Sequence, residues 1–273
     1  AAEAPGLASH ARLAILHAML GNGDMARATW ATALGDMNAG TADRAWGLAE
    51  YGNFLFATGR TAEARASHAA ALKLLPGYIP AELGLADVRA AEGDLDRAIA
   101  AYQVAIQRAP APETALKLGD LLAAAGRTSE AMEQYALVEA FAGLFESQGI
   151  RTELPVIHYY ADHGRATEAV AMARELYDQR PGIYAADALA WALHRAGSHE
   201  EAAGFAEEAA RFGTLDSALL YRAAVVLESA GEDERAAELL GSALDLNPRF
   251  SPLHAADAQV RLAELTNRVE VTE

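Results

Sequence analysis

The sequence predicts an all-α fold, a superhelical α-α solenoid of about seven helical hairpins that ends in a C-terminal capping helix. Three recurring residue types predict it. Glycines recur at separations of 36, 34, 33, 38, 33 and 34 residues, at Gly23, Gly59, Gly93, Gly126, Gly164, Gly197 and Gly231. An alanine stands five residues after each glycine, at Ala28, Ala64, Ala98, Ala131, Ala169, Ala202 and Ala236. A proline stands seventeen residues after four of the glycines, at Pro76, Pro110, Pro181 and Pro248.

Each recurring residue has a physical role in a helical hairpin. The glycine ends the first helix in a left-handed backbone conformation that other residues adopt only at a cost. The alanine lies where the second helix crosses the first, because a larger side chain there would force the two apart. The proline ends the second helix. Since one hairpin cannot bury its apolar face alone, neighbouring hairpins must share a continuous core.

The elements follow in order within a single expected domain, 1–273. The repeats are expected at about 9–42, 43–78, 79–111, 112–149, 150–182, 183–216 and 217–250, with the capping helix at 251–266. The third repeat shows helical spacing best, with apolar residues on both sides of its glycine, at Leu83, Leu85, Val88, Leu95, Ile99, Tyr102 and Ile106. The separation of 38 before Gly164 predicts a lengthened second helix, followed by a loop around Gln148-Gly149.

This pattern resembles the tetratricopeptide repeat. The small residue Ala86 (Gly52 and Gly119 in neighbouring repeats), the turn glycine and the aromatic Tyr102 match its motif, as do the alanines Ala98 and Ala105 and the terminal proline. The resemblance covers residues 9–250, although the tryptophan that the family has near the start of the first helix is missing. It extends to poorly characterised bacterial proteins of this family. It implies a right-handed superhelix whose first helices line a concave groove.

Composition limits the function classes. The net charge of −16, from 22 basic and 38 acidic residues, disfavours nucleic acid and anionic membrane surfaces, because both repel an acidic protein. The same charge favours a basic partner, and the side chains expected in the concave groove favour a partner that presents basic or apolar groups. The sequence has no cysteine, which excludes disulfides, thiolate metal sites and cysteine nucleophiles. No run of eighteen apolar residues occurs, so no span of a membrane is expected. The composition does not decide the cellular compartment of the protein.

The repeat register predicts which residues line the concave groove. Counting three, six and ten residues back from each turn glycine gives a lining that is apolar to mildly acidic, with an aromatic and histidine cluster toward the C-terminus. The candidate partner-binding residues are Asn53, Phe56, Asp87, Asp120, His158, Asp187, Trp191, His194, Tyr221 and Glu228. In the first repeat the same count gives Leu13, His17 and Leu20. The groove positions hold no lysine, which argues against a clamp for a C-terminal carboxylate of the kind found in chaperone-binding members of the family.

Two clusters allow alternative interpretations. Asp187, Trp191 and His194 share one face of a helix. In one interpretation they form a binding hot spot, and in the other Trp191 packs between neighbouring repeats. His158 and Asp162, four residues apart beside His163, could form part of a zinc site, or a polar helix end. His163 points about 100° away from Asp162 on a regular helix, which favours the polar end. We expect no metal and no cofactor.

No catalytic motif appears in the sequence, neither a G-x-S-x-G elbow nor a phosphate loop nor HExxH. The sequence therefore favours a scaffold or adaptor that binds another protein or peptide in its concave groove and is not an enzyme. The alternative is a structural spacer or self-association domain of a larger bacterial protein. An enzyme or metal-binding protein has the least support.

Overall fold

The computed structural model describes residues 6–36, 39–149 and 153–272, and every regular element in these ranges is a helix. Positions 1–5 and 273 of the expected domain, and position 150, where the fifth repeat is expected to begin, lie outside the described residues. The helices of the first four pairs are α1 Leu7–Met19, α2 Gly23–Leu34, α3 Thr41–Ala57, α4 Thr61–Leu74, α5 Ile79–Ala91, α6 Leu95–Arg108, α7 Pro112–Ala124 and α8 Thr128–Ser147. The remaining helices are α9 Glu153–Asp162, α10 Ala166–Gln179, α11 Ile183–Arg195, α12 His199–Ala210, α13 Ser217–Ser229, α14 Asp233–Leu246 and α15 Ala255–Thr272.

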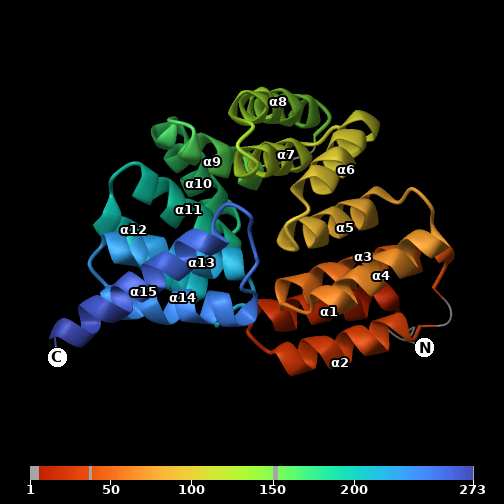
Figure 1. Ribbon diagram of the computed structural model, residues 1–273, viewed down its shortest axis with the longest axis horizontal. Helices are drawn as coiled ribbons and strands as arrows, with labels where there is room; N and C mark the ends of the chain where they lie inside the picture. Colours follow the sequence, from red (N-terminus) through yellow and green to blue (C-terminus); the bar gives the residue numbers. More distant parts are fainter. Residues whose placement is uncertain (1–5, 37–38, 150–152, 273) are drawn as a thin grey trace.

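The helices form pairs that stack side by side in a superhelix, as expected. Each odd-numbered helix packs against the even-numbered helix that follows it, and most consecutive odd-numbered helices also contact each other. In Figure 1, α1, α7 and α11 lie nearer the centre of the molecule than their partners α2, α8 and α12. The odd-numbered helices therefore form the inner wall. No helix in the described ranges has the length and apolar character needed to cross a membrane.

The turn glycines explain where the first helices end, with one correction. Those expected in the second to seventh repeats all have positive φ, at Gly59, Gly93, Gly126, Gly164, Gly197 and Gly231. In the first repeat the left-handed residue is Gly21, with φ 72°, whereas the predicted Gly23 begins α2. The sequence Gly21-Asn22-Gly23 offers a glycine at both positions, and the helix ends at the earlier one.

This shift of two residues corrects the register of the whole first repeat. The buried alanine at the helix crossing is Ala26, which is 0% exposed, whereas the predicted Ala28 is exposed. The positions that face inward become Ala11, Ile15 and Ala18 in place of Leu13, His17 and Leu20. In agreement, Ile15 and Ala18 line a cavity inside the superhelix.

Small residues on first helices make room for rings on second helices. A Cβ at Gly119 would lie 2.3 Å from a ring carbon of Tyr135, and a Cβ at Gly52 would lie 2.6 Å from the ring of His68. These distances are far below van der Waals contact, so only glycine fits beside each ring. The ring-against-glycine contact fixes how closely α7 approaches α8 and how closely α3 approaches α4.

The longest hairpin agrees with the sequence-based prediction, and the last helix is present but differs from the prediction in its bounds. The lengthened second helix is confirmed as α8, which has 20 residues, and Gly149 after it has a φ of 76°. The capping helix α15 begins at Ala255 and runs to Thr272, later at both ends than the expected 251–266. It packs against α14 and closes the C-terminal side of the stack.

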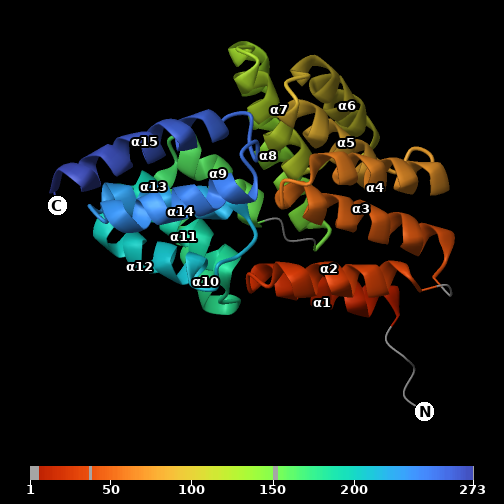
Figure 2. The ribbon, with the colours of Figure 1, turned by 60° about the horizontal axis from the view of Figure 1, so that its bottom comes forward.

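The superhelix makes a turn that returns to its own start, which the sequence did not predict. The backbone N–H of Leu215 donates to the carbonyl oxygen of Ala18 at 3.0 Å, and Asn247 Nδ2 donates to the carbonyl oxygen of Phe56 at 2.8 Å. Gly21 packs against backbone carbonyls so tightly that a Cβ there would lie 2.6 Å from the oxygen of Gly213. Figures 1 and 2 both show α1 and α2 beside the C-terminal repeats. The chain is therefore a closed ring of repeats rather than an open trough.

Candidate binding site

Ion pairs join successive helices of the inner wall. Asp87 on α5 lies 3.6 Å from Lys117 Nζ on α7, and Asp187 on α11 lies 2.5 Å from Arg222 Nη2 on α13. Two further pairs follow the same pattern, Asp162 with Arg195 at 3.4 Å and Glu228 with Arg261 at 2.6 Å. Much of the acidic lining that the sequence predicts is therefore engaged in contacts between repeats.

Tyrosines from second helices hold two of the predicted acidic residues. Tyr102 Oη donates to Asp87 and Tyr135 Oη donates to Asp120, each at 2.9 Å. Burial raises the pKa of Asp120 to about 6, against the opposing effects of Lys117 and of the Tyr135 hydrogen bond. Both carboxylates are half-buried, so they are oriented by the repeat and still reach the inner surface.

The predicted cluster on α11 lies inside the wall. Trp191 is 8% exposed and its Nε1 donates to Asp162 at 3.0 Å, so it packs between repeats against α9, the preceding inner helix. Asp187 is 2% exposed and receives a bidentate pair of hydrogen bonds from Arg222. Burial raises the pKa of Asp187, and Arg222 opposes that rise. His194, half-buried, stacks on Trp191 with ring centroids 5.3 Å apart. A role for these residues in partner binding stays a prediction, and it requires the wall to open.

The capping helix covers the C-terminal end of the predicted lining. Tyr221 is 5% exposed, and its hydroxyl donates to Asp257 on α15 at 2.7 Å. Glu228 accepts hydrogen bonds from Arg261 and Arg268, also on α15, each at 2.6 Å. These two residues anchor α15 to α13 and are withdrawn from the inner surface.

His158 lies on the inner wall between charged neighbours. Its Nε2 is 3.9 Å from Asp187 Oδ2. Burial, together with Arg222, lowers the pKa of His158 to about 3, so this imidazole is neutral near pH 7. Within the described residues, no group of three histidine, aspartate or glutamate side chains is arranged to hold a metal ion.

Asn53 and Phe56, on α3, lie where the ring closes. Asn53 is exposed and lines a hollow of about 290 Å³ between α1, α3 and α11. The carbonyl of Phe56 accepts the closing hydrogen bond from Asn247. The N-terminal end of the predicted lining is therefore the accessible end.

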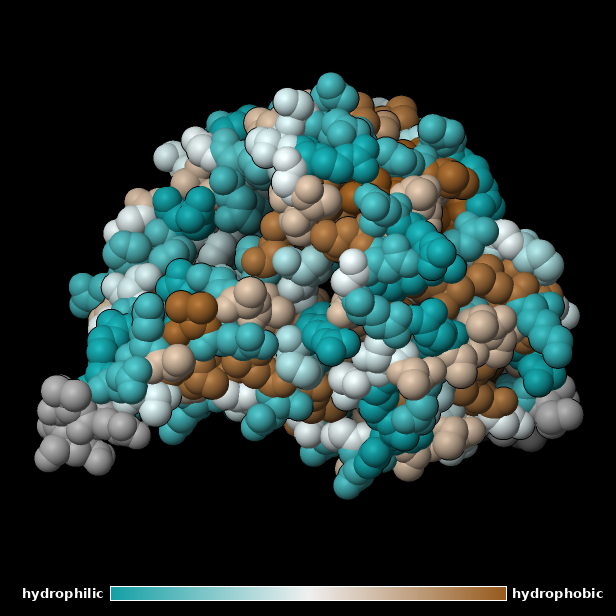
Figure 3. Space-filling model, viewed as in Figure 1, coloured by the Kyte–Doolittle hydropathy of each residue, from teal (hydrophilic) through white to brown (hydrophobic). Residues whose placement is uncertain are grey.

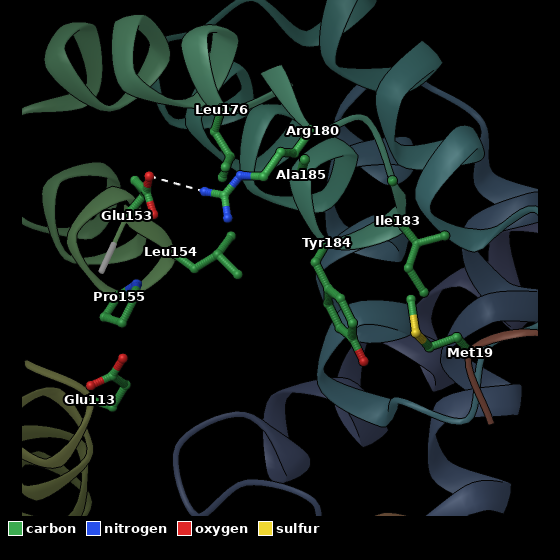
Figure 4. Close-up of a pocket in the computed structure, with 11 residues that line it drawn as sticks. Met19, Glu113, Glu153, Leu154, Pro155, Leu176, Arg180, Ile183, Tyr184 and Ala185 are labelled. Atoms are coloured by element: carbon green, nitrogen blue, oxygen red, sulfur yellow. Dashed lines mark hydrogen bonds and ion pairs between the residues drawn. The ribbon is translucent and has the colours of Figure 1, made fainter. Parts of the chain in front are cut away.

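A second hollow of about 340 Å³ adjoins the first. It is lined by the N-terminal ends of α7, α9 and α11 and by the end of α10, and it shares Met19 and Tyr184 with the hollow beside Asn53. Figure 4 shows the Tyr184 ring projecting into open space near Met19, with Glu113 and Leu154 on the far side. Together the two hollows form what we call the closure cavity, because residues of α1 complete it only when the ring is closed. Figure 3 shows the surface hollowed near the centre of the ring.

The lining of the closure cavity is apolar, aromatic and acidic. Its carboxylates are Glu50, Glu113, Glu153 and Asp216, and its one cation among the described lining residues is Arg180, which pairs with Glu153 at 3.0 Å. Burial raises the pKa of Glu50, and a hydrogen bond from Asn53 opposes that rise. Burial, with the nearby charges of Asp216 and Asp187, raises the pKa of Tyr184 to about 12, so its phenol stays neutral.

Sequence reasoning missed Tyr184, Glu50 and Asp216. Tyr184 stands thirteen residues before Gly197, outside the counted positions, at the first turn of α11. Glu50, nine residues before Gly59, was also outside the count. Asp216 precedes α13 and caps it, accepting from the backbone N–H of Ala218 and Leu219 at 3.1 and 3.0 Å. An aspartate directly before a serine-led apolar run is a recognisable N-cap, but only ring closure brings it to the cavity.

Another hollow, of about 430 Å³, lies between α8, α9 and α10. Its Glu139 accepts hydrogen bonds from Tyr160 and Arg165, each at 2.9 Å. Three consecutive helices build it, so it is a local feature of one hairpin and the next helix.

A family model and a solved structure agree with the fold. Residues 55–113 match a family model described as a tetratricopeptide repeat. The crystal structure of a tetratricopeptide repeat protein from Parabacteroides merdae is similar at 16% identity and a TM-score of 0.50, over 95% of this chain and 98% of that one. The APC/C hetero-tetramer Cut9–Hcn1 is similar at 19% identity and a TM-score of 0.48, over 81% of this chain and 42% of that one. A comparison with curated proteins finds no match.

Proposed function

Because this chain is a tetratricopeptide-repeat protein, we propose that it is a protein-binding module that holds an extended segment of another protein at the closure cavity. Repeats of this kind commonly mediate contacts between proteins and generally act as scaffolds. The proposal gives the chain no catalytic role.

One observation carries the proposal. The closure cavity gathers accessible side chains from distant repeats, including Asn53 on α3, Glu113 on α7 and Tyr184 on α11. Its hollows, of about 340 and 290 Å³, match the lower end of the range for ligand pockets, so they suit a few side chains of a segment rather than a folded domain. An exposed aromatic ring with polar groups around it is also the composition of a binding hot spot.

Affinity capture with matched variants tests the proposal. Tyr184→Ala removes the ring from the cavity, and we expect it to weaken capture of the partner by about tenfold or more. Val104→Ala is the control, because Val104 is 54% exposed on the second helix α6 and does not line the cavity. A partner that both variants retain equally well would refute binding at the closure cavity.

Exposed apolar side chains on the first hairpin favour a second candidate function, self-association. Leu13 and Leu16 on α1 and Met25 on α2 are 43%, 47% and 55% exposed. Sedimentation equilibrium distinguishes the two functions. A dimer that Leu16→Glu dissociates would support self-association, and a monomer at all concentrations would exclude it.

A further inference from the structure

The closure cavity holds more negative than positive charge. Of its four carboxylates, Glu153 pairs with Arg180. Glu50, Glu113 and Asp216 have no ion pair with any described residue. On the inner wall elsewhere, by contrast, Asp87, Asp162, Asp187 and Glu228 each have a basic partner on a neighbouring helix. These three carboxylates therefore lack the ion pair that most acidic residues of the wall form, although Arg222 lies near enough to Asp216 to interact with its charge.

Two of these carboxylates share one hollow with an aromatic ring. Glu50 and Asp216 both line the hollow beside Asn53, together with Tyr184, which is 38% exposed. Asp216 accepts both capping hydrogen bonds with Oδ1, and its Oδ2 accepts none from the described residues. The face of a tyrosine ring attracts a cation, and more strongly where water is excluded.

A buried donor in the same hollow also lacks a partner. Trp30 lines it, is 0% exposed, and has an indole Nε1 without a hydrogen-bond partner in the described structure. An indole N–H donates only, so an acceptor such as a peptide carbonyl is the group that suits it. Of the six buried side-chain atoms that lack a partner among the described residues, Trp30 Nε1 alone belongs to a residue that lines the closure cavity, so an occupant of the cavity is the group that could pair with it.

We propose that the closure cavity binds a lysine or arginine side chain of the partner's segment, with its cationic group between Glu50 and Asp216 and against the ring of Tyr184. This inference rests on the proposed function and specifies the chemistry of the occupant. The cation compensates carboxylates that form no ion pair with the described residues, and the segment's backbone supplies an acceptor for Trp30. Both needs are met by one basic residue within an extended peptide.

Three matched peptides test the proposal on the full chain. Each has leucines on both sides of a central residue, which is lysine, acetyl-lysine or glutamate. The chain has three tryptophans, and Trp30 lines the hollow, so intrinsic fluorescence follows binding, with Trp30→Phe as the check on the origin of the signal. We expect the lysine peptide to bind at least about tenfold more tightly than either of the others, since it alone forms charge-assisted hydrogen bonds with the carboxylates.

Variants separate the charge from the fold. Glu50→Gln combined with Asp216→Asn, which keeps the helix cap, should reduce the lysine preference to within about twofold. Glu133→Gln combined with Glu200→Gln removes the same charge from exposed positions outside the cavity and should leave the preference unchanged. Tyr184→Phe should bind the lysine peptide within about twofold of the native chain, and Tyr184→Leu several-fold more weakly.

The outcomes also separate this inference from the proposed function. Equal binding of all three peptides, binding of none at millimolar concentration, or a lysine preference that survives in the Glu50 and Asp216 double variant would each overturn the inference. If Tyr184→Ala still weakened capture of the natural partner in those cases, binding at the cavity would stand and only the cationic occupant would be wrong.

Discussion

Replacing Gly21 by alanine tests how firmly the ring is closed. Gly21 has a φ of 72°, and a Cβ there would lie 2.6 Å from the carbonyl oxygen of Gly213 and 2.7 Å from that of Phe212. Gly126 is the matched control, because its φ is 74° and a Cβ there would meet nothing within 4 Å. The two substitutions share the backbone strain and differ in the contact across the ring.

The expected magnitudes follow from that difference. Left-handed backbone costs alanine about 1–2 kcal/mol, so Gly126→Ala should destabilise the chain by about 1 kcal/mol once the lower entropy of its unfolded state is counted. Gly21→Ala has the same strain and an overlap that only movement of Phe212 and Gly213 relieves. The added loss cannot exceed the free energy of closure. From two hydrogen bonds and the partly buried Leu215 and Met19, closure is worth about 3–5 kcal/mol, so the added loss should be about 1–3 kcal/mol.

Urea unfolding followed by circular dichroism measures the two losses, and small-angle X-ray scattering measures the shape. Gly21→Ala should unfold at lower urea than Gly126→Ala and should increase the radius of gyration, because the first hairpin separates from the C-terminal repeats. Equal losses from the two substitutions, with the radius of gyration unchanged, would refute the reasoning.

Three further predictions concern the wall itself. Asp187→Ala should cost about 3–5 kcal/mol in urea unfolding, because it leaves the cation of Arg222 without its buried partner; a loss below about 1 kcal/mol would contradict this. Burial raises the pKa of Asp120 to about 6, so the folded state binds more protons than the unfolded state and the native chain loses stability as pH rises toward 6. Asp120→Asn removes that titration, so the variant should become about 1 kcal/mol more stable relative to the native chain as pH rises from about 5 to 7.5. A stability difference between variant and native chain that is the same at both pH values would contradict this prediction. Gly119→Ala should lower the melting temperature and cost about 1–3 kcal/mol, since its Cβ would overlap the ring of Tyr135, and a gain in stability would show that the ring moves freely.

The helices and their pairing were predictable because each turn needs a residue that tolerates positive φ, and glycine marks it. The one error, Gly23 for Gly21, arose where glycines flank Asn22 and either could end the helix. Burial decides between them, since Ala26 is buried and Ala28 is exposed. Single-sequence spacing contains no information on that burial.

The candidate site was predictable only in part. The repeat register identified inward-facing positions such as Asn53. It could not show which of these positions a neighbouring helix covers: α15 covers Tyr221, and α9 packs against Trp191. Closure of the ring depends on small rotations summed over every repeat. It also uses backbone carbonyls, such as that of Phe56, which leave no trace in side-chain patterns.

An engineered disulfide between the first and sixth hairpins tests ring closure most directly. The chain has no cysteine, so Ala18→Cys with Leu215→Cys creates a single possible bridge. The backbone N–H of Leu215 donates to the carbonyl oxygen of Ala18 at 3.0 Å, so these two residues are neighbours across the closed ring. We expect the bridge to form under mild oxidation in the folded protein and to raise the urea midpoint. Two free thiols in a protein that keeps its full helical circular dichroism would show that the ring is open.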